Sequence, residues 1–214
     1  ESDFMKPIML KIKGFNSFID EQVIDFQKLM DKGIFGIFGP TGSGKSSIID
    51  AMTFALYGSV ARYENLERRA FINANTDSTL VEFKFSLTTD KTVYYEVSRE
   101  IKKSKAGRLT HNARLIKTVD DIVEVISDKT NSVADKIIEI IGLNYQDFIR
   151  SVVLPQGKFS EFLLLKSKEK REIYIRRKTD LHGGGNFNIC RKKRLYKKTF
   201  WFGTKIYGKA PYPQ

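Results

Sequence analysis

Residues 39–47 read GPTGSGKSS and contain what a phosphate-binding loop requires. Glycines let the backbone adopt conformations closed to other residues and approach an anion closely. The N–H groups of such a loop can converge on phosphate oxygens at the positive end of the following helix. We expect Lys45 to reach the β- and γ-phosphates, and the Ser46 hydroxyl to ligate Mg²⁺, which prefers oxygen ligands. The predicted contacts with a nucleoside triphosphate come from the whole loop: Gly39, Pro40, Thr41, Gly42, Ser43, Gly44, Lys45, Ser46 and Ser47.

The residues on either side of this loop predict the two elements that would position it. Residues 33–38 form a short apolar run bounded by glycines, which is typical of a buried strand. Residues 48–56 carry apolar side chains at 48, 49, 52, 55 and 56, which fall on one face of a helix. Gly58 follows as the predicted C-cap. A strand, a glycine-rich loop and a helix in succession favour a functional site over a chance glycine-rich turn.

Composition limits the class of protein. A chain of 214 residues with 41% apolar and 29% charged residues can bury one core. Its single cysteine, Cys190, excludes an internal disulfide and a cysteine-based metal cage. The sequence contains no apolar stretch long enough to cross a bilayer and no signal-peptide block, so we expect a cytoplasmic protein without membrane contact. Residues 1–4 precede Met5, a natural initiator, and are interpreted as a leader remnant.

Positive charge is concentrated near the end of the chain. The net charge is +12, and residues 173–214 supply +10 of it through eleven Lys/Arg and one Asp. The high net charge is therefore no evidence that the rest of the chain binds nucleic acid. We interpret residues 173–214 as the product of a truncation or frameshift. A genuine basic and aromatic nucleic-acid-binding tail is the alternative.

Alternating and periodic apolar residues predict the remaining elements. We expect paired strands at 7–15 and 22–26, then a surface loop at 60–78 and a hairpin of strands 80–87 and 92–101. Further strands are expected at 112–117 and 121–125, and helices at 132–141, 145–150 and 159–172. Antiparallel hairpins directly after the phosphate-loop helix favour the mixed sheet of an ABC-type ATPase head.

Four segments together resemble the SbcC family, SMC-related DNA-repair ATPases that form the large subunit of a bacterial nuclease. They are GFNSF at 14–18, GPTGSGKSSIIDAMTFALYG at 39–58, VEFKF at 81–85 and SVVLPQGKFSEFLLLKSKEKRE at 151–172. The resemblance covers residues 5–172. It depends most on the segment around Gln156, because many ATPases share the phosphate loop alone. It implies an α/β P-loop NTPase fold, the N-lobe of an ABC-type ATPase head.

The resemblance also implies roles for particular residues. Gln156 matches the glutamine that ligates Mg²⁺ and helps to place the attacking water, which makes it and Lys45 the predicted catalytic residues. Asn16 and Ser17 lie where family members approach the nucleotide from the first strand turn. Some relatives carry an arginine there, so a direct charge contact from Asn16 is in doubt.

Residues 102–108 place four cations at a predicted hairpin tip. A solvated turn is the usual interpretation of such a charge run. In the SbcC family the heads bind double-stranded DNA across basic surface features, so the resemblance makes these four candidates for phosphate contact: Lys102, Lys103, Lys105 and Arg108.

The resemblance implies that this chain lacks parts of a complete ATPase. In the family, an acidic residue after an apolar strand and a serine-glycine signature lie beyond a long coiled coil. The implied partners are therefore a C-terminal ATPase lobe, a second SbcC head, an SbcD-type nuclease subunit and DNA. We expect the chain to hydrolyse little ATP by itself.

The predicted organisation is a leader remnant at 1–4, the ATPase lobe at 5–165, the start of a coiled-coil helix at 166–172 and the atypical tail at 173–214. A head fragment of another SMC or ABC-type ATPase, or a nucleic-acid-binding remnant driven by the tail, is the alternative.

Overall fold

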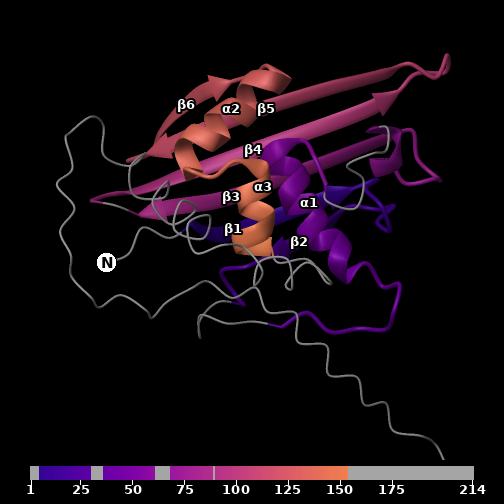
Figure 1. The fold of residues 1–214 in the computed structure, drawn as a ribbon, viewed down its shortest axis with the longest axis horizontal. Coiled ribbons are helices and arrows are strands. Elements are labelled where there is room, and N and C mark those ends of the chain that lie inside the picture. The colour runs from indigo at the N-terminus through magenta and orange to yellow at the C-terminus, as the bar shows by residue number, and fades with distance from the viewer. Residues whose placement is uncertain (1–4, 30–35, 61–67, 89, 154–214) are drawn as a thin grey trace, which may run out of the picture.

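The computed structural model describes residues 5–29, 36–60, 68–88 and 90–153. Within these ranges, six strands form an antiparallel sheet in the order β2-β1-β3-β4-β5-β6 (Figure 1). The predicted pairing of the first two strands and the predicted hairpin are confirmed. The strands are β1 (Met5–Lys13), β2 (Gln22–Asp25), β3 (Ser78–Thr88), β4 (Thr92–Lys103), β5 (Leu109–Val119) and β6 (Ile122–Ser127).

The two faces of the sheet differ because side chains alternate along each strand. On β3, Val81, Phe83 and Phe85 are buried on the inner face. The residues between them point outward and form cross-strand ion pairs. Glu82 lies 3.0 Å from the Lys11 ammonium, and Lys84 lies 2.7 Å from the Glu96 carboxylate. This alternation fixes the register of the hairpins, since a slip of one residue would bury these charges.

Helices cover the inner face of the sheet (Figure 1). The phosphate-loop helix α1 (Lys45–Tyr57) packs on β3 and β4, and α2 (Thr130–Ile141) packs on β5 and β6. The short helix α3 (Tyr145–Phe148) continues into a π-helical segment, Ile149–Val153. Left-handed glycines end both longer helices: Gly58 after α1, as predicted, and Gly142 after α2.

An aromatic cluster holds α1 on the sheet. The Phe54 ring lies 5.4 Å from the Phe15 ring and 5.1 Å from the Phe71 ring, and all three side chains are buried. Phe71 belongs to a 3₁₀ turn, Arg68–Phe71, within the segment predicted to be a surface loop. That prediction is wrong at Phe71, because its ring closes the core and its carbonyl accepts a hydrogen bond from the Asn16 N–H.

The buried face of α1 is also broader than the sequence suggested. Ala51, Phe54 and Tyr57 are buried in addition to the predicted positions 52, 55 and 56, whereas Ile48 and Ile49 are half-buried. The Tyr57 hydroxyl donates a 2.9 Å hydrogen bond to the Leu143 carbonyl. Burial raises the pKa of this hydroxyl, and the charge of Asp147 raises it further.

The predicted strand before the phosphate loop is not formed in its described part. Residues 36–38 are not in a strand, and the Phe38 side chain is 78% exposed. A strand needs hydrogen-bonding neighbours, and none of the six described strands pairs with these residues. Residues 33–35, Gln156, the helix predicted at 159–172 and the tail lie outside the described residues. Among the described helices, none combines the length and apolar character needed to span a membrane.

Candidate nucleotide-binding site

The phosphate loop has the backbone conformation that its glycines predict. Gly42 has a φ of 85° and Gly44 a φ of 84°, both in the left-handed region that glycine enters at little cost. Gly44 is also the N-cap of α1. A methyl group on Gly44 would lie 3.1 Å from the Phe18 ring and 3.4 Å from the Ser17 Cβ. The loop therefore requires glycine here both for conformation and for close packing.

The start of α1 is open to an anion. The first N–H groups of a helix have no intrahelical partner, and the N-cap residue here, Gly44, supplies no side-chain hydrogen bond to them. The first turn carries no acidic residue that would compete with a phosphate. The positive end of the helix dipole also lies at this point. The geometry therefore fits the predicted phosphate cradle.

Lys45 lies across the loop that it is predicted to serve. Its ammonium donates to the carbonyls of Gly39 at 2.8 Å and Pro40 at 2.6 Å, and it lies 3.4 Å from the Ser43 hydroxyl. All three partners are exposed loop residues. The charge is therefore held over the loop by groups that a phosphate can replace.

The first strand turn reaches the loop from the other side. The Ser17 hydroxyl lies 3.5 Å from the Ser47 hydroxyl, which is buried in the first turn of α1. Asn16 has a left-handed φ of 50°, and its backbone carbonyl accepts a hydrogen bond from the Asn73 side chain. Its own side-chain amide is buried and has no hydrogen-bond partner among the described residues. The structure thus brings Ser17 to the loop and leaves a buried amide beside it.

The donor set fits a magnesium ion that is shared with a nucleotide. In the described ranges, no three or more His, Cys, Asp or Glu residues gather into a protein-only metal site. Mg²⁺ commonly takes only one or two protein ligands and completes its shell with phosphate oxygens and water. Ser46 is exposed in the first turn of α1 and offers such an oxygen. The other predicted ligand, Gln156, lies outside the described residues.

The predicted basic tip is the turn between β4 and β5. Backbone hydrogen bonds between Ser104 and Arg108, and between Gly107 and Ser104, close it. Lys102 pairs with Glu100 at 2.8 Å, so its charge is partly neutralised. Figure 1 shows this tip at the upper right and the phosphate loop at the lower right, so the two are separate features.

Sequence reasoning missed a buried arginine on β4. Arg99 is 1% exposed, and its Nε donates to the Ala55 carbonyl at 2.7 Å. Its Nη2 donates to the Leu56 carbonyl at 3.1 Å. The alternation of β4 contains the signal that would have revealed it, because Arg99 lies between the buried Val97 and Ile101 at every second position. A charge at an inward position needs partners, and the end of a helix supplies them.

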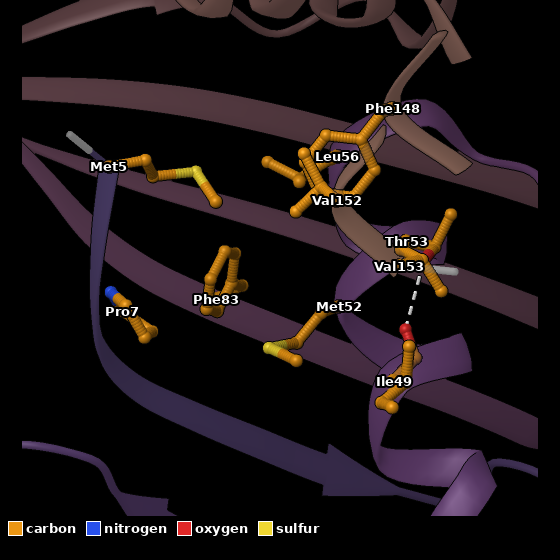
Figure 2. A pocket seen from close by; sticks show the side chains of 10 residues that line it. All are labelled: Met5, Pro7, Ile49, Met52, Thr53, Leu56, Phe83, Phe148, Val152 and Val153. Carbon is orange, nitrogen blue, oxygen red and sulfur yellow. Dashed lines mark hydrogen bonds between the residues drawn. The ribbon is translucent and has the colours of Figure 1, made fainter. Parts of the chain in front are cut away.

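A separate hollow lies between α1, the sheet and the segment that leads toward Gln156. Figure 2 shows apolar side chains around it, among them Met52 and Leu56 from α1, Phe83 from β3, and Phe148 and Val153 beyond α3. Among the described residues, no charged side chain lines this hollow. This apolar lining does not suit a triphosphate, and the loop stays the candidate nucleotide site.

Comparison with known proteins shows the family of this chain. A family model described as an AAA domain matches residues 9–182, well over half of the chain. The chain belongs to the AAA domain family. This match confirms the predicted P-loop ATPase class and makes the loop part of a nucleotide-binding domain.

Curated relatives of this AAA domain agree with the resemblance. The chain is 46% identical over 195 residues to the SbcC subunit of the nuclease SbcCD from Clostridium acetobutylicum, an alignment that covers 89% of this chain and 16% of that protein. It is 48% identical over 173 residues to the protein of the same name from Bacillus subtilis, covering 80% and 15%. The predicted resemblance to SbcC is confirmed. The chain therefore spans less than one fifth of the length of these relatives.

One solved structure also aligns with this AAA domain. It is the recombination mediator protein RecF with ATP, which has a TM-score of 0.41 and 14% sequence identity. The alignment covers 76% of this chain and 42% of that chain. A similarity of this size carries no argument about function.

Proposed function

We propose that this chain is the ATP-binding N-terminal lobe of an SbcC-like ATPase of DNA double-strand-break repair, which controls an SbcD-type nuclease. The observation that carries the proposal is the loop itself. It combines left-handed Gly42 and Gly44, an uncapped helix start and Lys45 held over the loop carbonyls. The 46% and 48% identity to SbcC proteins supports the assignment of the whole protein.

Each predicted residue has a definite task in this proposal. The loop N–H groups bind the phosphate oxygens, and Lys45 exchanges the carbonyls of Gly39 and Pro40 for the β- and γ-phosphates. Ser46 and Gln156 hold Mg²⁺, which neutralises phosphate charge when bound. Asn16 and Ser17 approach the nucleotide from the first strand turn. Gln156 also orients the attacking water.

Hydrolysis in this proposal needs more than this chain. Phosphoryl transfer depends on charge stabilisers and a positioned water around the γ-phosphate. By the resemblance, a C-terminal lobe and a second head supply the acidic and serine-glycine elements. The purified chain should therefore bind ATP and turn it over little. A robust ATPase rate from residues 1–214 that Lys45→Ala abolishes would overturn the proposal that hydrolysis needs more than this chain.

The nucleotide assignment is tested by competition. A fluorescent ATP analogue is bound to the chain and displaced by ATP, ADP or AMP. Because the predicted contacts are to the β- and γ-phosphates, affinity should fall at each loss of a phosphate. Lys136→Ala, at an exposed lysine of α2 paired with Glu139, is the control and should not change this order. Equal affinities for ATP and AMP would contradict the proposal.

The basic tip is proposed to contact double-stranded DNA. Removing Lys102, Lys103 and Lys105 together should weaken binding and flatten its salt dependence by about two to three units of log–log slope, at about 0.9 per phosphate contact. Lys102 is expected to contribute least because Glu100 already pairs with it. An unchanged slope would show that the tip is only a solvated turn.

We also propose that the full protein works in the cytoplasm, with an SbcD-type nuclease as its partner. The relatives are named as part of SbcCD, which supports this partner. Immobilised SbcD-type nuclease should retain the full-length protein. Selective retention by a kleisin-type partner instead would favour a chromosome-condensation ATPase.

A further inference from the structure

The C-terminal end of α1, opposite the phosphate loop, is hydrogen-bonded to a side chain of the sheet. Arg99 of β4 donates to the carbonyls of Ala55 and Leu56, and its Nη1 lies 3.5 Å from the Thr130 carbonyl at the start of α2. The Tyr57 hydroxyl binds the Leu143 carbonyl nearby. One guanidinium thus joins a strand, the end of α1 and the start of α2.

Arg99 resists any movement of α1 along its axis. A guanidinium stays protonated in proteins, so its charge persists at 1% exposure. The carbonyls it binds lie at the negative end of the helix dipole and lack intrahelical partners. Sliding or turning α1 would separate a buried charge from these acceptors, which is strongly unfavourable.

The residue that follows α1 makes room for this contact. A methyl group on Gly58 would lie 3.0 Å from Nη1 of Arg99 and 3.3 Å from its Cζ. Gly58 also has a φ of 71°, and its N–H donates to the Phe54 carbonyl at 2.7 Å. The C-cap glycine and the arginine therefore form one closely packed anchor.

The opposite end of α1 carries the groups proposed to contact the phosphates, and there the buried Ser47 lies 3.5 Å from the Ser17 hydroxyl. Lys45 and Ser46 begin the helix, and the Lys45 ammonium is held only by exposed loop groups among the described residues. A helix of 13 residues is a rod of about 20 Å. Because a helix moves as a rigid rod, an anchor at its C-terminal end helps to set the position of the loop at its other end, together with the aromatic contacts of Phe54.

We propose that Arg99 is a positioning residue of the nucleotide site, which sets the place of the phosphate loop by anchoring the far end of α1. The expected effect of Arg99 on nucleotide affinity rests on the proposed function. Its expected effect on the position of the loop is independent of that function.

The first test needs no nucleotide. Amide spectra of the ¹⁵N-labelled chain are compared for wild type, Arg99→Lys, Arg99→Met and Arg114→Met. Arg99→Lys keeps the charge but loses the fork that binds two carbonyls at once. Arg114 is the matched control, because it is an exposed arginine on the neighbouring strand β5. We expect the Gly44 amide signal to shift or broaden in both Arg99 variants and to stay in place in Arg114→Met.

The second test measures Mg-ATP affinity at a temperature where every variant compared is folded. We expect about a tenfold loss of affinity in Arg99→Met, a smaller loss in Arg99→Lys and no change in Arg114→Met.

If Arg99→Met does not fold, the Gly44 signal and the Mg-ATP affinity are both measured on Arg99→Lys alone. A folded Arg99→Lys chain with the wild-type Gly44 signal and affinity would overturn the inference and leave Arg99 a purely structural residue. If wild type itself binds no Mg-ATP, the proposed function fails, and the Gly44 signal still decides the role of Arg99.

Discussion

The inner face of the sheet and the phosphate loop use their polar groups in opposite ways. On the inner face, Arg99 is buried and bound to carbonyls of α1. In the loop, Gly42 and Ser46 are exposed, and the N-cap Gly44 provides no side-chain cap to α1. In the buried region, polar groups are bound to the protein and hold α1 in place. In the loop, the backbone N–H groups stay available to a ligand. Four sets of variants and one ligand titration test this difference.

The largest effect is expected from Phe54→Ala, because its ring packs between Phe15 and Phe71 in the core. We expect a loss of about 3–5 kcal/mol in the free energy of unfolding, measured by urea denaturation. Phe38→Ala is the control, because Phe38 is 78% exposed beside the loop, and it should cost below about 0.5 kcal/mol. Similar losses at the two sites would mean that Phe38 is also packed, against the distinction drawn here.

Gly58→Ala should cost more than Gly107→Ala although both glycines have a left-handed φ, of 71° and 80°. The backbone term is about 1–2 kcal/mol in each. Only at Gly58 would the new methyl group also meet Arg99, whereas no atom of the described residues lies within 4 Å of such a methyl group at Gly107. We expect a difference of about 1 kcal/mol between the two variants by urea denaturation. Equal losses would show that the guanidinium moves aside freely.

Tyr57→Phe removes the hydroxyl that binds the Leu143 carbonyl. We expect a loss of about 1 kcal/mol near neutral pH, because a buried carbonyl loses its donor. Burial raises the pKa of Tyr57 above 10.0, so its contribution is complete below pH 10 and is lost as pH rises further. The loss of stability above pH 10 should therefore be smaller in the variant than in wild type. Identical pH profiles from pH 8 to 11 would argue against a buried hydroxyl.

The smallest effect is expected on the outer face, at the pair of Lys11 and Glu82. Both side chains are partly exposed, so a double-mutant cycle with Lys11→Met and Glu82→Gln should give a coupling below about 1 kcal/mol. Salt should reduce this coupling further. A coupling of several kcal/mol that salt leaves unchanged would mean that this face is covered by protein.

Local patterns predicted the sheet and the loop well, because both depend on short-range rules. Alternation along residues 80–101 predicted the β3–β4 hairpin, and the glycines predicted the loop conformation. The end of α1 at Gly58 was predicted from another short-range rule, the preference of glycine for the C-cap of a helix. In each of these cases the determining residues lie close together in the sequence.

The failures came from contacts between distant residues. The polar and irregular composition of residues 60–78 predicts a surface loop, but Phe71 in this segment packs against Phe15 and Phe54. Arg99 was overlooked because its acceptors lie more than forty positions away. Residues 36–38 have the composition of a buried strand, but composition does not reveal whether a neighbouring strand is present.

Residues 39–47 are proposed to bind the phosphates of ATP. Calorimetric titration of the purified chain with Mg-ATP tests this proposal most directly, with Lys45→Ala measured in parallel. We predict saturable binding at one site in wild type and about a hundredfold weaker binding in Lys45→Ala, because charged hydrogen bonds contribute about 1.5–3 kcal/mol each. The melting temperature should be nearly unchanged, since Lys45 binds only exposed loop groups among the described residues. Absence of binding in wild type, or equal binding in Lys45→Ala, would contradict the account.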